Sequence, residues 1–382
     1  MKLTQLFSEF FESEKASGII LILCTVISLG IANSVFGADY QHFWHTDFAG
    51  HPIEFWINDG LMAIFFLLIG LELEREIYIG ELSDIKSAAL PIFAALGGIL
   101  IPAGLYLVFN YGTPMQSGAG IPMATDIAFA LGILSLLGNK VPASLKIFLT
   151  ALAVIDDLGA ILVIAIFYTK ELLLHNLFIV LGVFGVLLIM NRLKVRNLIP
   201  YLIGGVVMWY FMLNSGIHAT ITGVLLAFAI PFGNGDEKST SYILQHFLHK
   251  PVSFVILPLF AIANTAIVIG SDISEILSQQ YSIGIATGLI VGKPLGIMLF
   301  SFSAVSLGLC KLPGDMNWKA ILGVSFLAAI GFTMSIFVTL LAFADPIIVA
   351  NSKFVILLTS FAAATMGFLL LKTTLHIKLK ML

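Results

Sequence analysis

The chain has 382 residues, of which 59% are hydrophobic and 11% charged, and its formal net charge is −3. Soluble domains are about 45–50% apolar and about 25% charged, and disordered chains are rich in charge and poor in aromatic residues, so this composition excludes both classes. The basic residues form no run, which excludes a nucleic-acid partner, and we expect an all-α polytopic membrane protein surrounded by the lipid bilayer.

Apolar runs long enough to cross a bilayer, about 20 residues each, recur along the whole chain. The segment before the first run carries Glu9, Glu12 and Glu14 and lacks the basic start of a cleavable signal, so we expect the first run to be retained. We predict twelve spans, near residues 16–36, 57–74, 88–110, 121–138, 143–168, 172–190, 198–213, 216–231, 251–270, 283–307, 319–343 and 353–371.

The segment from Asp39 to Trp56, between the first two spans, alternates polar and aromatic residues around a turn at Gly50-His51-Pro52. This pattern predicts a short external β-hairpin. A lone two-stranded hairpin is marginally stable in water. The hairpin is therefore expected to pack either against the hairpin of a second subunit or on the protein's own surface.

Lys and Arg accumulate on the cytoplasmic side of membrane proteins, and their positions orient the predicted spans. With both termini inside, only Lys170 and Lys353 of the 19 basic residues fall on outside segments, and Lys293 falls within a span. All the others lie inside. One span more or fewer in the middle of the chain would destroy this bias, which supports both the orientation and the number of spans.

Four charged residues stand out at mid-membrane depth: Asp126 in the fourth predicted span, Asp156 and Asp157 near the middle of the fifth, and Lys293 near the middle of the tenth. A charge at mid-membrane depth costs about 3 kcal/mol on insertion scales and indicates a functional site. One Asp paired with Lys293 could be purely structural, but three carboxylates against one ammonium leave negative charge for a mobile cation or proton. Neighbouring helical residues point about 100° apart, so Asp156 and Asp157 cannot occupy equivalent positions. Their carboxylate oxygens are the ligands that a hard cation prefers.

Two spans are predicted to be broken. Pro122 and Thr125 interrupt the fourth span just before Asp126, and the eleventh carries Ala329-Ile330-Gly331-Phe332-Thr333 at its centre. Spans three to five and ten to twelve are seven spans apart, and an odd offset reverses their orientation. Two inverted sets with broken middle helices are typical of secondary transporters that bind substrate at the midplane.

Enzymatic sites have no counterpart in this sequence. It has no Walker motif, no His-Glu-x-x-His and no Gly-x-Gly-Asp, and no soluble segment large enough to hydrolyse a nucleotide. We therefore expect a protein that is no enzyme, needs no cofactor, and is driven by an ion gradient.

The sequence resembles the NhaA family of Na⁺/H⁺ antiporters, a group with inverted repeats. The matching motifs run in family order over essentially the whole chain. They are Gly70-Leu71-Glu72 with Arg75-Glu76, Met123-Ala124-Thr125-Asp126-Ile127-Ala128-Phe129-Ala130, Ala153-Val154-Ile155-Asp156-Asp157-Leu158-Gly159, Asn214-Ser215-Gly216-Ile217-His218-Ala219-Thr220, Gly292-Lys293-Pro294-Leu295-Gly296 and Gly331-Phe332-Thr333-Met334-Ser335.

The resemblance implies that Asp156 and Asp157 exchange protons for Na⁺ or Li⁺, and that Lys293 pairs with Asp156 in a proton-loaded state. It implies that Asp126 and Lys293 offset the dipole ends of spans four and eleven, which cross where they are unwound. Thr125 supports the site and Gly331 lies in the unwound part of the eleventh span. Transport would be electrogenic, export Na⁺ across a bacterial inner membrane, and be active at neutral to alkaline pH.

The resemblance also implies how the single transporter domain is divided. The core would come from residues 88–168 and 283–371, and the panel from 16–74 and 172–270, with the hairpin at 39–56 joining a homodimer. A pH-sensing group at the cytoplasmic ends would contain Glu72, Arg75, Glu76, His218, His246 and His249. Gln245 and Glu74 depart from the family pattern, which has an acidic and a basic residue there, so the pH of activation is not fixed. His218 could equally be a satisfied histidine at a helix end.

Two other functions remain open at the level of the residues. A symporter that couples an organic solute to Na⁺ or H⁺ would use a similar frame, but only Lys293 could anchor an organic anion. A passive cation channel needs a continuous pore and does not need paired titrating carboxylates.

Overall fold

The computed structural model describes residues 2–168, 172–270 and 272–380, with only the backbone described at 2–14, 85–87, 139 and 376–380. Nine helices in these parts of the chain are long and apolar enough to cross a membrane, and a tenth candidate is the pair α16–α17, bent by 47°. The prediction of an all-α polytopic membrane protein is confirmed. The nine are Lys15–Ala32, Ile53–Tyr78, Ala88–Asn110, Pro114–Ser135, Ala143–Phe167, Leu174–Arg192, Thr240–Asn264, Gln280–Ser306 and Pro346–Leu375.

The two remaining predicted spans are shorter than a bilayer requires. Helix α9 (Leu198–Leu213) has 16 residues and α10 (Ile221–Ala229) has 9, against about 20 for a straight crossing. The predicted eighth span began at residue 216, but Gly216 has a φ of +89° and lies in the turn that precedes α10. A residue in this left-handed conformation cannot continue a right-handed helix.

The chain forms two units, and the first contains Met1–Tyr40, Asp84–Ala160 and Asn264–Leu382. Its helices pack closely where glycines meet: a Cβ atom added to Gly97 of α5 would lie 2.1 Å from the Gly296 oxygen of α15. Small residues allow this approach of helix backbones. The elements of this unit are α1 (Lys2–Ala32), α5 (Ile85–Asn110), η3 (Pro114–Met123), α6 (Ile127–Ser135), η4 (Gly138–Lys140), α7 (Ala143–Phe167, whose last residues belong to the second unit), α13 (Ile273–Ser278), α14 (Gln280–Thr287), η6 (Gly288–Gly292), α15 (Lys293–Ser306), α16 (Trp318–Ala328), α17 (Phe332–Ala342) and α18 (Pro346–Lys380).

Helix α1 lies in the first unit. It packs against α6, where a Cβ atom on Gly18 would lie 3.1 Å from the Cα atom of Gly132. The two glycines let the helices approach closely, a contact that hydropathy alone does not reveal.

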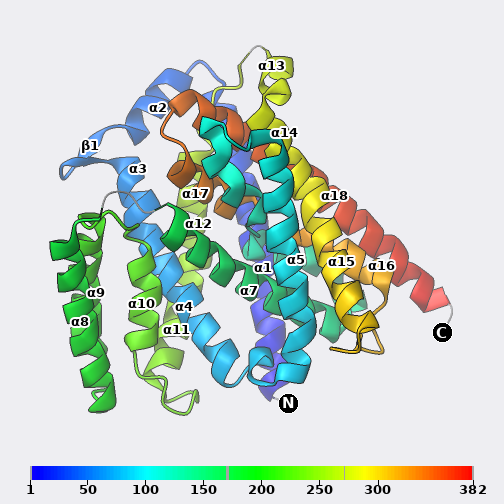
Figure 1. Cartoon of the computed structure of the whole chain (residues 1–382), viewed down its shortest axis with the longest axis horizontal. Coiled ribbons are helices and arrows are strands. Elements are labelled where there is room, and N and C mark those ends of the chain that lie inside the picture. The colour runs from blue at the N-terminus through cyan, green and yellow to red at the C-terminus, as the bar shows by residue number, and fades with distance from the viewer. Residues whose placement is uncertain (1, 169–171, 271, 381–382) are drawn as a thin grey trace. The chain divides into compact units, whose positions relative to one another are not determined.

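The second unit contains Gln41–Ser83 and Ile161–Ala263. Helix α4 packs against α10 through Gly70 and Gly223, and α8 lies beside α9 (Figure 1). The elements of this unit that follow the hairpin are α3 (Ile53–Phe55), η1 (Trp56–Leu61), α4 (Met62–Tyr78), η2 (Glu81–Ser83), α8 (Leu174–Arg192), α9, α10, α11 (Thr240–Pro251), η5 (Val252–Ile256) and α12 (Leu257–Asn264).

The hairpin is shorter than predicted. Strands β1 (Asp47–Phe48) and β2 (His51–Pro52) pair antiparallel, and the turn between them has positive φ angles at Ala49 and Gly50. The first half of the predicted segment is instead the helix α2 (Gly37–Trp44), which has Asp39 in its first turn, where a carboxylate favours helix formation. The hairpin turn is confirmed, and its extent was wrong.

The ninth predicted span, 251–270, is displaced along the chain. The helix begins at Thr240, continues through Pro251 and ends at Asn264. Its first part, α11, carries Gln245, His246, His249 and Lys250, so its hydropathy does not reveal it as part of a membrane helix.

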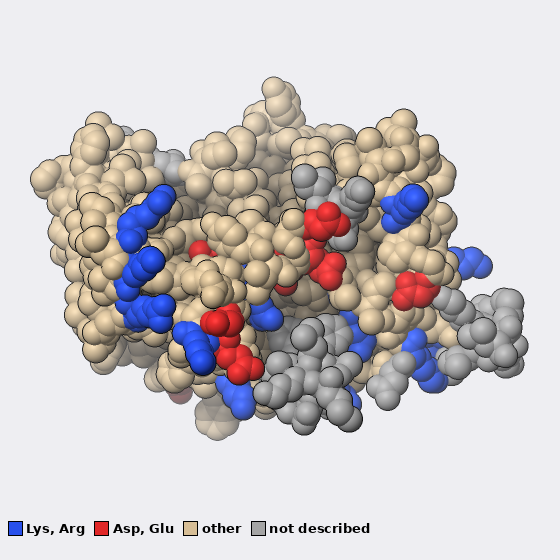
Figure 2. Space-filling model, turned by 90° about the horizontal axis from the view of Figure 1, so that it is seen from below, with Lys and Arg blue, Asp and Glu red and all other residues tan. Residues whose placement is uncertain are grey.

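The face seen from below exposes several Lys and Arg side chains beside Asp and Glu (Figure 2).

Candidate ion-binding site

The fourth span is broken at the predicted place. A 3₁₀ helix, η3, ends at Met123, Ala124 and Asp126 have extended backbones, and α6 begins at Ile127. Pro122 has no amide proton and cannot join a regular ladder of hydrogen bonds. Asp126 caps the new helix, because its Oδ1 atom accepts a hydrogen bond from the Phe129 amide at 3.0 Å. The sequence did not predict that the first half of this span is a 3₁₀ helix.

The eleventh span is broken between α16 and α17, also as predicted, at residues 329–331. Gly331 precedes α17 and has no space for a side chain, since an added Cβ atom would lie 2.0 Å from the Ser335 Oγ atom. The Phe332 amide, the first of α17, donates to the Ser360 hydroxyl of α18 at 3.1 Å. A neighbouring helix thus satisfies a backbone group that the break exposes.

The two breaks lie against each other and exchange hydrogen bonds. The Asp126 amide donates to the Ile330 oxygen at 2.7 Å, and the Thr125 hydroxyl lies 2.8 Å from the Ala328 oxygen. The Ser335 hydroxyl donates to the Ile121 oxygen at 2.7 Å. Each break therefore supplies partners for backbone groups that lose their helical partners in the other.

Asp126 serves the first turns of two helices. Besides capping α6, its Oδ2 atom accepts hydrogen bonds from the amide of Thr333, at 3.0 Å, and from the Thr333 hydroxyl, in the first turn of α17. Because a helix N-terminus carries partial positive charge, one carboxylate compensates two of them. Lys293 complements this arrangement, since its ammonium donates to the Met123 oxygen at the end of η3.

Asp156 and Lys293 form a buried ion pair. The Nζ atom of Lys293 lies 2.9 Å from the Oδ2 atom of Asp156, and neither side chain is exposed. The Thr125 hydroxyl, 2.8 Å away, donates to the same oxygen. The other carboxylate oxygen, Oδ1, is buried and has no hydrogen-bond partner in the described residues. Such an acceptor costs about 1–3 kcal/mol, which a bound proton or cation would recover.

Asp157 follows Asp156 on α7 and is also buried, with 1% of its surface exposed. The fifth span therefore buries two adjacent carboxylates beside one ammonium, as the sequence predicted. No cluster of three or more His, Cys, Asp or Glu side chains suited to a metal occurs in the part of the chain described. The site is thus a pair of carboxylates with neighbouring hydroxyl and carbonyl oxygens.

The residues of the predicted pH-sensing group lie in the second unit, and the structure brings part of the group together. The Arg75 guanidinium lies 5.9 Å from the centre of the Tyr242 ring, which stacks on His246 at 5.0 Å. Glu76 accepts a hydrogen bond from the Glu81 amide at 3.0 Å. Glu72 is on the same helix, α4, and His249 is on the same helix as His246, α11.

His218 is not brought to these residues. It lies in the turn before α10, and Gly223, five residues later, packs against Ala63 and Phe66 in the first turns of α4. Arg75 lies in the last turn of α4. Because α10 runs alongside α4 in the same direction, His218 lies near the start of α4 and Arg75 lies at its end.

The polar residues that the sequence reasoning missed are Thr333 and Ser335, and Ser360 on the adjacent α18. Thr333 and Ser335 directly follow the break at Gly331, so a hydroxyl beside a broken helix was a usable signal. Ser360 lies in a long apolar helix, and nothing in its sequence neighbourhood distinguishes it.

Comparisons with known proteins agree over almost the whole chain. The family model described as Na+/H+ antiporter 1 matches residues 8–371. The chain is 74% identical over 372 residues to the Na⁺/H⁺ antiporter NhaA of Flavobacterium psychrophilum, covering 97% of each chain. It is 65% identical to NhaA 1 of Flavobacterium johnsoniae, covering 97% of this chain and 98% of that one, and 61% identical to NhaA of Dechloromonas aromatica, covering 96% of each.

Proposed function

The chain belongs to the NhaA family of Na⁺/H⁺ antiporters, and we propose that it exports Na⁺ or Li⁺ electrogenically by alternating access at Asp156 and Asp157. It is a multi-pass membrane transporter and not an enzyme. We place it in a bacterial inner membrane with both termini in the cytoplasm and twelve spans, of which α9 and α10 are the short ones. The concentration of Lys and Arg in the segments predicted to lie inside supports this orientation.

The buried pair of Asp156 and Lys293 is the observation that carries the proposal. Its ammonium occupies one carboxylate oxygen at 2.9 Å, and the second oxygen is left without a partner in the described residues. A Na⁺ ion about 4 Å from that ammonium would be repelled by about 4 kcal/mol at an effective dielectric constant of about 20. Na⁺ and the protonated Lys293 therefore compete for Asp156.

This competition links ion binding to proton release. Na⁺ binds when both carboxylates are ionised, so Asp157 must release its proton. The Lys293 ammonium must also leave Asp156, either by moving away or by losing its own proton. If both protons leave for one Na⁺, each cycle moves one net charge, which gains about 2.3 kcal/mol per 100 mV of membrane potential. An inside-negative potential then drives Na⁺ out of the cell.

Activation at neutral to alkaline pH follows from the same competition. Protons at high concentration hold the site in the loaded state, so an acidic cytoplasm stops Na⁺ from binding. Arg75 and His246, which both contact the Tyr242 ring, belong to the group that we propose as the pH sensor.

A homodimer joined through the external hairpin is supported by the hairpin's exposure. Phe48 is 64% exposed and both strands have only two residues. A hairpin this short is marginal alone, and pairing with a second hairpin would cover its apolar side chains.

The test is exchange in everted membrane vesicles that contain Asp157→Asn. We expect this variant to insert normally but to lose Na⁺-dependent recovery of the pH gradient, because Asn can neither bind a proton nor carry a charge. Asp345→Asn is the matched control, since Asp345 accepts a hydrogen bond from the Ile347 amide at the start of α18, outside the site. Normal exchange by Asp157→Asn would refute the assignment.

Proteoliposomes then test ion choice and electrogenicity. Addition of Na⁺ or Li⁺ is expected to release protons at pH 8 and much less at pH 6, and K⁺ is expected to have no effect. A membrane potential of the favourable sign should accelerate exchange. Conductance without coupled proton movement would instead indicate a channel.

A further inference from the structure

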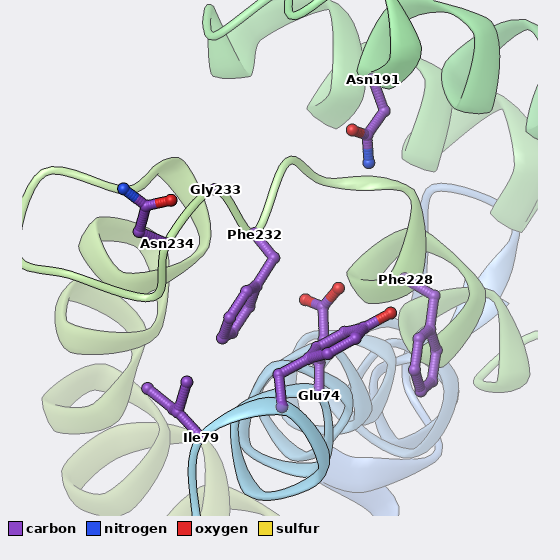
Figure 3. A pocket seen from close by; sticks show the side chains of 8 residues that line it. Glu74, Ile79, Asn191, Phe228, Phe232, Gly233 and Asn234 are labelled. Carbon is purple, nitrogen blue, oxygen red and sulfur yellow. The ribbon is translucent and has the colours of Figure 1, made fainter. Parts of the chain in front are cut away.

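A cavity of about 510 Å³ lies within the second unit, and the carboxylate pair of α7 does not line it. The C-terminal part of α4, the ends of α8 and α10, and the loop after α10 surround it (Figure 3). Its volume falls in the range of about 300–1,000 Å³ that is usual for small-molecule sites. Neither the antiport mechanism nor the pH-sensing group uses this cavity.

Glu74 supplies the carboxyl group of the cavity. The residue is 4% exposed, and its Oε2 atom is buried without a hydrogen-bond partner in the described parts of the chain. Figure 3 shows its carboxyl group pointing into the space between Phe228 and Phe232. A buried carboxyl oxygen without a partner is costly, so a ligand that donates a hydrogen bond or brings positive charge is favoured here.

Asn191 offers a second acceptor. Its Nδ2 atom donates one of its two protons to the Ala229 oxygen at 3.0 Å, and its amide oxygen is an acceptor. Tyr78 and Asn234 also line the cavity, and each offers both a donor and an acceptor. Glu74 is therefore the side chain that disfavours an anionic ligand here.

Aromatic rings form much of the remaining wall. Tyr78 and Phe232 both line the cavity, with ring centres 5.0 Å apart and planes inclined by 38°, and Phe228 is a third ring. Aromatic faces attract ammonium groups, and cages of such rings recognise alkylated ammonium ions. A bare metal ion instead needs about six oxygen ligands, and these rings provide no such set.

We propose that this cavity binds an organic ammonium group, with Glu74 as its counter-ion and the rings of Tyr78, Phe228 and Phe232 as its walls. The group can belong to a free amine or to the head group of an aminophospholipid, since both present the same chemistry. The sequence departs from its family pattern at Glu74, where a basic residue is expected by resemblance. The proposal does not depend on the antiport mechanism.

The first arm of the test uses choline chloride, titrated by calorimetry into delipidated wild-type protein in a neutral detergent. Glu74→Gln keeps the shape of the side chain and removes its charge, and we expect the dissociation constant to rise at least about tenfold. Phe232→Leu should weaken binding about threefold or more, because it removes one ring and keeps an apolar side chain. Glu81→Gln is the control: it removes an exposed carboxylate just after α4, and its dissociation constant should stay within about twofold of the wild type.

The second arm uses nanodiscs with equal amounts of phosphatidylethanolamine and phosphatidylglycerol, and native mass spectrometry of the lipids that remain bound. Preferential retention of phosphatidylethanolamine by the wild type and by Glu81→Gln, but not by Glu74→Gln, would identify the lipid as the source of the ammonium group. Binding of choline with the same dependence would identify a free amine. Failure of both probes to bind the wild type, or equal binding by Glu74→Gln, would overturn the proposal.

Folding of Glu74→Gln is checked by its thermal melting and by Na⁺-driven exchange, both expected to match the wild type. If this variant does not fold, Phe232→Leu tests the proposal instead. An unchanged affinity of Phe232→Leu for choline would show that the ring does not bind the ammonium group and would overturn the proposal. Loss of exchange by Asp157→Asn without loss of choline binding would separate this site from the antiport site.

Discussion

Replacing Thr125 by Val removes one hydroxyl from the ion pair and preserves the shape of the side chain. The Thr125 hydroxyl has a single proton and lies 2.8 Å from both the Oδ2 atom of Asp156 and the Ala328 oxygen. A hydrogen bond to a charged group contributes about 1.5–3 kcal/mol. Because Lys293 still contacts Asp156 at 2.9 Å, we expect the lower value, about 1.5 kcal/mol, which corresponds to about a tenfold change in an equilibrium constant.

The direction follows from what Na⁺ requires. The Thr125 hydroxyl stabilises the ionised form of Asp156, and in the proposed mechanism Na⁺ binds that form. The Val variant should therefore have a KM for Na⁺ about ten times that of the wild type near neutral pH. The difference should shrink as the pH rises, because fewer protons compete for the carboxylate. The assay is Na⁺-dependent recovery of the pH gradient in everted vesicles, measured over a range of Na⁺ concentrations and pH.

Thr359→Val is the matched control for this substitution. Thr359 is also buried in a membrane helix, but its hydroxyl donates to the Val355 oxygen of its own helix at 2.7 Å, far along the chain from the carboxylates. Its KM for Na⁺ should stay close to that of the wild type. A KM within twofold of the wild type for Thr125→Val would show that the hydroxyl does not stabilise the ionised site and would refute the reasoning.

Three further predictions follow from the described contacts. Gly331→Ala should destabilise the protein by about 1–3 kcal/mol and so lower its melting temperature in detergent, because the added Cβ atom would meet the Ser335 hydroxyl at 2.0 Å. Gly182→Ala is the control: its Cβ atom would have nothing within 4 Å, and its melting temperature should not fall. Asp126→Asn should destabilise the protein by about 0.3–1 kcal/mol for each of the two helix N-termini, and unchanged melting would contradict this compensation. Burial raises the pKa of the Cys310 thiol, so its labelling by maleimide should be slow at pH 7 and still rise above about pH 10, whereas a plateau by about pH 10 would indicate an ordinary thiol.

The sequence predicted the parts of the fold that polar residues mark within apolar runs. Pro122 and Gly331 located the two breaks, and Asp126, Asp156 and Lys293 located the charges that the structure brings together there. Charged residues in an apolar span are costly, so their positions are informative even without knowledge of packing.

Packing and helix ends could not be read in the same way. Hydropathy records how apolar a segment is, and it did not reveal the polar helix α11 or the positive φ of Gly216 that shortens α10. The place of α1 beside α6 depends on the contact of Gly18 with Gly132, a close approach that no single span reports. The separation of His218 from Arg75 likewise depends on the direction in which α10 runs along α4, which the motifs alone do not give.

The hydrogen bonds of the three site carboxylates indicate how their roles divide. Both oxygens of Asp126 accept hydrogen bonds, from Phe129 and from the amide and hydroxyl of Thr333, so this carboxylate is engaged by the two broken helices. Asp156 differs, since only its Oδ2 atom has partners in the described residues. A carboxylate whose oxygens already hold helix ends can take up Na⁺ only by releasing them, at the cost of both caps. In the proposed mechanism Asp126 is therefore the fixed charge that the breaks need. Na⁺ and protons would exchange at Asp156 and Asp157, once the Lys293 ammonium withdraws or loses its proton.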